Sequence, residues 1–269
     1  MSTIEPSASS NGRGSDAWLR SWTHFSIDRR SPGYCRVTFD HPPINTITAT
    51  TVDELAELVG LIEEDQDLIV VAFDSANPDF YLADYDTEHD PSRAAALPVG
   101  PTGMHTWLDL LVRLSRAPVV SIASIRGRAR GGGSEFVLAC DLRFASRENT
   151  LLGQFEVATG GVPGASPIER LSHLVGRGRA LEILLVADEV DGPRAEQYGY
   201  VNRVIADDQL DDEVDQIASR LARFDHDAIS RTKSYVDRAT LRPDSELPSA
   251  LANFFELLGR PGQQARPDP

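Results

Sequence analysis

The sequence predicts an α/β fold, in which strands alternate with helices and a helical C-terminal third follows. Two short, mostly apolar runs, 68–74 (LIVVAFD) and 119–125 (VVSIASI), have the length and composition of strands buried in a sheet. Between and after these runs, apolar residues recur at helical spacing. This alternation is typical of α/β proteins, and a chain of 269 residues can bury a large core.

The remaining elements follow in chain order. Residues 22–28 and 34–39 are expected to pair as strands around the turn RRSPG. A helix is predicted from Thr51 and another over 104–116, each with apolar residues on one face. After the second apolar strand come a glycine turn and a helix that opens at Ser134. Short strands are then expected at 142–145 and 150–152, and helices over 167–175, 179–186, 193–198, 210–224, 228–239 and 247–258.

The predicted organisation has four parts. Residues 1–16 lack the apolar stretch of a secretory signal and are expected to form a disordered tail. The α/β core is assigned to 17–206, the helical region to 207–259 and a flexible tail to 260–269. The helical region carries more apolar residues than 60 or so residues can bury alone, which predicts a homo-oligomer. They are Val214, Ile217, Leu221, Leu251, Phe254 and Phe255.

Composition excludes several classes of function. A net charge of −15 argues against nucleic acid as a partner, because phosphate binding needs a basic surface. No apolar run approaches the roughly 20 residues that cross a bilayer, so no membrane partner is expected. Cys35 and Cys140 are far apart and the six histidines show no paired spacing, which predicts no metal site and a reducing, cytoplasmic location. The single lysine, Lys233, lacks a phosphate-loop context and reads as part of a solvated helix face.

The stretch RARGGGSEF places three glycines directly before a helix start and Glu135 in its first turn. Glycines let the backbone approach a ligand closely, and the unpaired N–H groups of a helix start favour an anion. A glutamate here could equally stabilise the helix dipole without any catalytic role. A second carboxylate, Glu156, follows 21 residues later in LLGQFEVATGG. Two carboxylates at one apolar pocket tend to divide into one acid and one base, as addition of water to a double bond requires.

These motifs resemble the crotonase superfamily, the enoyl-CoA hydratases and isomerases. HPPINTI resembles that family's Arg-Pro-Pro-x-Asn-Ala-Leu, with His41 in place of the arginine, and GRARGGGSEF resembles its Gly-x-Ala-x-Gly-Gly-Gly-x-Glu-Leu. CDLRFAS and LGQFEVATGGVPG match two further family motifs, in the family's order and spacing. The resemblance runs from about Trp22 to Phe255. It implies a crotonase-like spiral of ββα units with a C-terminal helical oligomerisation domain, assembled as a homo-trimer or homo-hexamer.

The resemblance also implies a site and a substrate. The ligand is an acyl-CoA thioester, so coenzyme A enters as part of the substrate and no cofactor is expected. Its carbonyl oxygen would lie between the backbone N–H groups of Gly132 and Leu82, with Glu135 and Glu156 as the catalytic pair. Leu82 lies in FYLADYD, where the family has Phe-x-Ala-Gly-Ala-Asp-Leu, and Ala83 replaces a glycine. Tyr81 and Tyr85 are expected to narrow the acyl pocket.

Reversible hydration of a 2-enoyl-CoA thioester is therefore the predicted activity, because both glutamates of the hydratases are present. Two alternatives stay open at this point. One is other crotonase chemistry, such as double-bond isomerisation or hydrolysis of a thioester or diketone. The other is a family member that binds acyl-CoA without catalysis. Five arginines are candidates for contact with the CoA phosphates, namely Arg29, Arg30, Arg126, Arg128 and Arg130.

Overall fold

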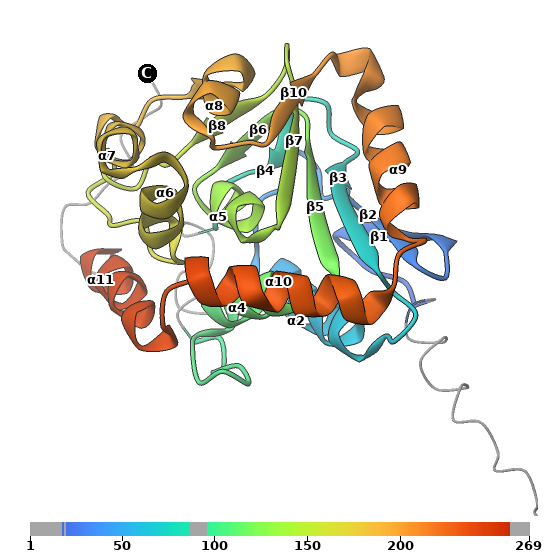
Figure 1. Cartoon of the computed structure of the whole chain (residues 1–269). Helices are drawn as coiled ribbons and strands as arrows, with labels where there is room; N and C mark the ends of the chain where they lie inside the picture. Colours follow the sequence, from blue (N-terminus) through green and yellow to red (C-terminus); the bar gives the residue numbers. More distant parts are fainter. Residues whose placement is uncertain (1–17, 19, 87–95, 259–269) are drawn as a thin grey trace, which may run out of the picture.

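The computed structural model describes residues 18, 20–86 and 96–258, so both predicted tails lie outside the described residues. A six-stranded sheet crosses the molecule in the order β1-β2-β3-β5-β7-β10 (Figure 1). The first two strands form the expected antiparallel hairpin, and every later pair in this sheet is parallel. The α/β prediction is confirmed. The strands are β1 (Phe25–Ser31), β2 (Tyr34–Phe39), β3 (Val70–Ser75), β5 (Val120–Ile125), β7 (Leu142–Ser146) and β10 (Arg203–Ile205).

A second, smaller sheet has the order β4-β6-β8-β9. Its strands are β4 (Phe80–Leu82), β6 (Arg128–Arg130), β8 (Leu151–Gly153) and β9 (Val190–Asp191). Strands β3, β5 and β7 of the large sheet each lead within a few residues to β4, β6 and β8 of the small one, and a helix follows each time. These helices are α4 (Thr106–Arg116), α5 (Gly132–Ala139) and α6 (Pro167–Val175). The chain therefore winds through successive ββα units, as the crotonase resemblance implied.

Helix α5 lies at the centre of the molecule (Figure 1), and all eight of its residues are buried. Its Phe136 ring meets Phe39 and Phe73 edge-on, with ring centroids 5.4 and 5.0 Å away. The amphipathic helix α2 (Ala49–Glu64) packs against α4 on the outside of the same core. Because α5 is surrounded by the core, its first turn has little freedom to move, and that turn carries Glu135.

The helical C-terminal part is packed more closely onto the sheet than the sequence predicted. Helix α9 (Leu210–Leu221) lies on β3, β5 and β7, and it buries Leu210, Val214 and Ala218 in a second apolar cluster on that face. On the other side of the molecule, α11 (Pro248–Leu258) places Leu251 and Phe254 against the main core. Most of the apolar side chains from which a homo-oligomer was predicted are therefore packed within the chain itself.

Helix α10 (His226–Thr240) crosses in front of the core in Figure 1 and has no buried residue. Lys233 anchors this helix to the core, because its Nζ donates to the Val119 carbonyl at 2.8 Å and to Asp141 Oδ2 at 2.7 Å. The lysine side chain is only 9% exposed, so the predicted solvated position is wrong. The remaining elements are α7 (Arg177–Val186), α8 (Gly192–Tyr198) and the 3₁₀ turns η1 (Asp207–Gln209) and η2 (Asp244–Glu246).

Each helix along these described stretches is too short or too polar to span a bilayer.

Candidate active site

The glycine turn connects β6 to α5, and the helix begins at Gly132, two residues before the predicted Ser134. Gly131 has φ +46°, a conformation that L-residues with a side chain rarely adopt. Gly133 lies so close to β4 that a Cβ there would be 2.1 Å from the Leu82 carbonyl oxygen. The triplet therefore lets the start of α5 press against the end of β4, and this contact brings the backbones of Gly132 and Leu82 to the same site.

Glu135 lies in the first turn of α5 and is 5% exposed. Its Oε2 accepts from the Trp107 indole Nε1 at 2.7 Å, and its Oε1 accepts from the Ala165 backbone N–H at 2.7 Å. Burial raises the pKa of Glu135, and these two donors oppose the rise because they stabilise the ionised form. Sequence reasoning did not identify Trp107 or Ala165, which lie 28 and 30 residues away along the chain.

Glu156 lies just beyond β8, on the turn that Gly161 N–H closes to its carbonyl at 2.6 Å. Its carboxylate faces the glycine turn, since a Cβ on Gly131 would be 3.3 Å from its Oε1 and 2.7 Å from Asp84 Oδ1. Burial raises the pKa of Glu156 to about 8, and the nearby charges of Glu135 and Asp84 add to the rise. The structure thus brings together the two glutamates that the sequence singled out, and it places a third carboxylate beside them.

Gln154 connects Glu156 to the interior. With its amide nitrogen toward the carboxylate, it donates to Oε1 and Oε2 of Glu156 at 2.9 and 3.0 Å, and its oxygen accepts from Ser134 Oγ at 2.8 Å. The Ser134 hydroxyl is also hydrogen-bonded to the Tyr200 hydroxyl. An amide can present either its NH₂ or its oxygen, so Gln154 can match either protonation state of Glu156. The sequence contained Gln154 in the second motif, but nothing in that motif pointed to Tyr200.

The Tyr85 side chain lies beside the site that Glu135 and Gly132 form. Its ring meets the Trp107 ring edge-on, with centroids 5.9 Å apart, and its backbone N lies 3.4 Å from the point where a Cβ of Gly132 would be. The Tyr85 hydroxyl is buried and has no hydrogen-bond partner among the described residues. Burial raises the pKa of this phenol, and the charge of Glu135 contributes to the rise. A buried unpaired hydroxyl beside the glutamates is a group that a polar ligand atom could satisfy.

The neighbouring residues of this loop lie differently from what was expected. Tyr81 is fully buried in the aromatic core, where its hydroxyl donates to the Phe73 carbonyl at 3.2 Å, so the structure does not bring it to the site. The Leu82 side chain is also buried in the main core, at 1% exposure. Ala83 does not have positive φ, and its N–H donates to the Asn45 carbonyl at 3.2 Å. The loop therefore accommodates alanine without backbone strain at that position.

The five arginines considered for CoA phosphates all pair with carboxylates. The pairs are Arg29–Asp65, Arg30–Asp28, Arg126–Asp207, Arg128–Glu189 and Arg130–Asp84. Each charge is thus already matched within the chain, and the geometry singles out none of them as a phosphate ligand. Over the described ranges, no three His, Cys, Asp or Glu side chains are grouped closely enough to hold a metal ion.

Comparison with known proteins identifies the class that this fold and site represent. The family model described as enoyl-CoA hydratase/isomerase matches residues 29–263. The chain belongs to the enoyl-CoA hydratase/isomerase family, and the crotonase resemblance is confirmed.

Individual relatives agree with that assignment. The short-chain-enoyl-CoA hydratase of Clostridium acetobutylicum is 29% identical over 226 residues, 83% of this chain and 84% of that protein. The crotonyl-CoA hydratase of Syntrophomonas wolfei is 30% identical over 216 residues, 80% of this chain and 81% of that one. Among solved structures, a candidate enoyl-CoA hydratase from Streptomyces avermitilis is 40% identical, with a TM-score of 0.86 over 91% of this chain and 88% of that chain.

Proposed function

We propose that this protein catalyses the reversible hydration of a 2-enoyl-CoA thioester. The observation that carries the proposal is that Glu135 at the start of α5 and Glu156 beyond β8 face the same glycine turn in two different environments. The proposal also rests on the relatives named above, two of which are called enoyl-CoA or crotonyl-CoA hydratases. Coenzyme A is then part of the substrate, and the reaction needs only acid–base groups and a polarised carbonyl.

From these environments we infer the roles of acid and base. Glu135 accepts from two groups that can only donate, so its carboxylate form is the better matched of its two states. Glu156, with a pKa of about 8, keeps its proton at neutral pH. Glu135 therefore takes a proton from the attacking water, whose oxygen bonds to C3 of the substrate, while Glu156 delivers a proton to C2. Exchange of protons with solvent after product release restores both groups.

The enolate oxygen that forms in this step needs donors aimed at it. We assign this role to the backbone N–H groups of Gly132 and Leu82, because the close approach at Gly133 holds these two segments together. Such a donor contributes about 3–4 kcal/mol to a transition state in a site without water. The Tyr85 hydroxyl, which lacks a partner among the described residues, is positioned to receive a polar atom of the bound substrate.

Assembly and location complete the proposal. We expect a homo-trimer or homo-hexamer, because α10 exposes Tyr235 (68%) and the preceding turn exposes Phe224 (47%). We expect a cytoplasmic location, because the chain's cysteines, Cys35 and Cys140, are both free thiols.

The test is incubation with 2-enoyl-CoA thioesters of increasing chain length, following the loss of the conjugated thioester absorbance. Hydration consumes the conjugated double bond and gives a 3-hydroxyacyl-CoA, which mass spectrometry identifies. A product of unchanged mass would assign double-bond isomerisation, and release of free CoA would assign thioester hydrolysis. Binding of the thioesters without any turnover would overturn the proposal in favour of a non-catalytic acyl-CoA-binding protein.

A further inference from the structure

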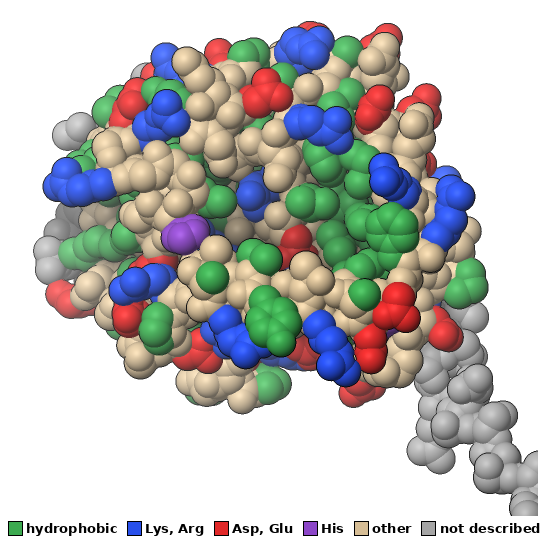
Figure 2. Space-filling model, in the orientation of Figure 1, with side chains coloured by type: hydrophobic (Ala, Val, Ile, Leu, Met, Phe, Trp, Pro, Cys, Tyr) green, Lys and Arg blue, Asp and Glu red, His purple; other side chains and the backbone are tan. Residues whose placement is uncertain are grey.

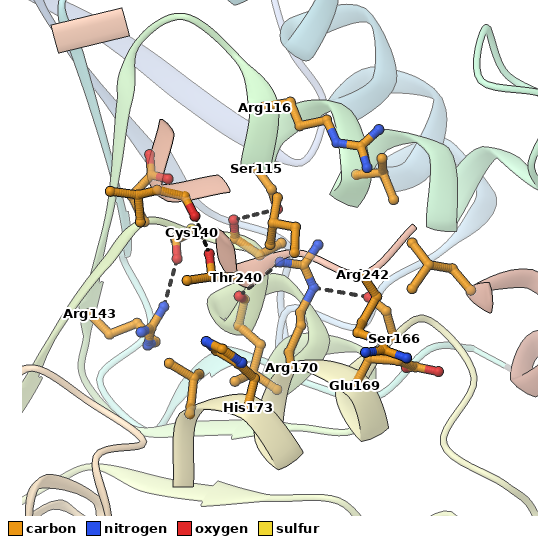
Figure 3. Close-up of a pocket in the computed structure, with 18 residues that line it drawn as sticks. Ser115, Arg116, Cys140, Arg143, Ser166, Glu169, Arg170, His173, Thr240 and Arg242 are labelled. Carbon is orange, nitrogen blue, oxygen red and sulfur yellow. Dashed lines mark hydrogen bonds between the residues drawn. The ribbon is translucent and has the colours of Figure 1, made fainter. Parts of the chain in front are cut away.

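A cavity of about 260 Å³ lies outside the catalytic site, between the C-terminal end of α5, helix α6 and helix α10. Figure 2 shows this face hollowed above α10, with a basic side chain visible inside the hollow and a histidine at its edge. Figure 3 shows the residues that line it, with Arg170 at the centre and Arg143 reaching in from the side of β7. Since Glu135 is at the first turn of α5 and this cavity is at its last, the two sites are distinct.

Both central arginines are held by neutral oxygens only. The Arg143 Nε donates to the Tyr200 carbonyl at 2.8 Å and its Nη1 to the Cys140 carbonyl at 2.6 Å, while its Nη2 has no partner among the described residues. The Arg170 Nε donates to Ser166 Oγ at 2.9 Å, and its terminal nitrogens make long contacts of 3.3 and 3.4 Å to two carbonyls. Neither guanidinium forms an ion pair within the part of the chain that is described.

Burial of two unpaired like charges is costly, and their pKa values reflect the cost. Burial lowers the pKa of Arg143, and burial together with the charge of Arg143 lowers the pKa of Arg170 to about 10. The charges of the two carboxylates at the wall, Asp141 and Glu169, offset this cost only in part: both raise the pKa of Arg170, but neither forms an ion pair with Arg143 or Arg170 in the described structure. Asp141 already pairs with Lys233, and burial raises the pKa of Glu169, whose buried Oε2 has no partner in the described structure.

Ser115, Thr240 and two further arginines also line the cavity, but Arg116 pairs with Asp244 and Arg242 with Glu246. Much of the remaining wall is apolar, from Val112, Leu138, Leu174, Val236, Leu241 and Leu247. The volume corresponds to roughly nine waters at about 30 Å³ each, so a ligand of about that many non-hydrogen atoms fits in it. A site with guanidinium donors at one end and apolar walls around it is complementary to a carboxylate with a short hydrocarbon tail.

We propose that this cavity is a second binding site, and that it takes a small carboxylic acid in its ionised form. The carboxylate would accept from the unpaired Nη2 of Arg143 and from the terminal nitrogens of Arg170, and the tail would lie against the apolar side chains of α4, α5 and α10. The proposal does not depend on the hydratase assignment, because its test uses no thioester.

The probe is hexanoate, which has eight non-hydrogen atoms, titrated into the whole protein by calorimetry. We expect one saturable site per chain. Hexanol, which lacks the negative charge, and inorganic phosphate, which lacks the hydrocarbon tail, should each bind at least about tenfold more weakly than hexanoate. Arg170→Gln should weaken hexanoate about tenfold or more through loss of a charge-assisted hydrogen bond. Arg220→Gln on the exposed face of α9 is the matched control and should leave binding unchanged.

A second variant keeps the test valid if Arg170→Gln does not fold. His173→Trp adds bulk at the rim, on an exposed position of α6, and leaves both arginines in place. It should abolish hexanoate binding while circular dichroism stays that of the wild type. Absence of saturable binding by the folded wild-type protein at millimolar hexanoate would overturn the proposal. So would binding that His173→Trp leaves intact, because the ligand would then occupy another place, such as the catalytic site.

Discussion

Replacement of Trp107 by phenylalanine tests whether Glu135 acts as the base. The change removes the indole N–H that donates to Glu135 Oε2 at 2.7 Å and leaves a 5% exposed carboxylate that keeps its backbone donors, among them the Ala165 N–H. A hydrogen bond to a buried charged group is worth about 1.5–3 kcal/mol, and one pKa unit corresponds to about 1.36 kcal/mol. The pKa of Glu135 should therefore rise by about one to two units.

The assay is the pH profile of kcat/KM with an enoyl-CoA thioester. The acidic limb reports ionisation of the base in the free enzyme, so it should move to higher pH by the same one to two units, while the alkaline limb, set by loss of the Glu156 proton, should stay where it is in the wild type. The pH dependence of the free energy of unfolding is an independent test. Because Glu135 has a raised folded-state pKa, its contribution to stability is lost as pH rises, and the deficit of Trp107→Phe relative to wild type should grow from acid to alkaline pH.

The matched control is Trp22→Phe, since the Trp22 indole nitrogen has no hydrogen-bond partner in the described part of the chain. It should leave the acidic limb where it is in the wild type. An unshifted limb in Trp107→Phe, or an equal shift in both variants, would refute the assignment of Glu135 as a base tuned by the indole.

Three further predictions follow. Glu156→Gln should lower turnover at least about 10²-fold, and a variant that keeps full activity would show that Glu156 is only a packing residue. The wild type should lose unfolding free energy as the pH rises from the unfolded pKa of Glu156, near 4.3, to its folded pKa of about 8, and Glu156→Gln should remove this loss. Gly133→Ala forces the Leu82 carbonyl away from α5 and should lower kcat about 10²-fold. The control Gly178→Ala, at a position with open space around it, should leave kcat unchanged. Equal kcat values for the two variants would show that the close approach of Gly133 to Leu82 is not needed. Sedimentation at micromolar concentration should show an oligomer that Tyr235→Asp weakens, and a single-chain species for the wild type would contradict the assembly proposed for α10.

Sequence patterns predicted the long elements well because periodic burial specifies them locally. Helix α6 begins at Pro167 and ends at Val175, as predicted, since proline at the first helical position and Gly176 after the last mark both ends. The strands of the small sheet were missed, apart from β8, because β4, β6 and β9 contain only two or three residues each and show no periodicity. The sequence thus predicted the fold class but not the second sheet.

The site was predictable only where a motif contains its residues. Glu135 and Glu156 stood out because a carboxylate beside glycines in an apolar setting is unusual. Their partners Trp107 and Ala165 come from other turns of the spiral, and no local pattern connects residues about 30 positions apart. The two tyrosines of the loop show the same limit: Tyr85 lies over the site and Tyr81 lies in the core, and sequence alone does not give the face on which each side chain falls.

The anchoring of α10 by Lys233 has a practical consequence for chemical labelling. No other lysine occurs in the sequence, and this one is ion-paired with Asp141 and largely covered. Amine-directed dyes, biotin or a sensor surface should therefore couple poorly to this side chain near neutral pH, because an ion-paired ammonium group must lose its proton before it reacts. Helix α10 and the arginine cavity beside it would then stay unmodified.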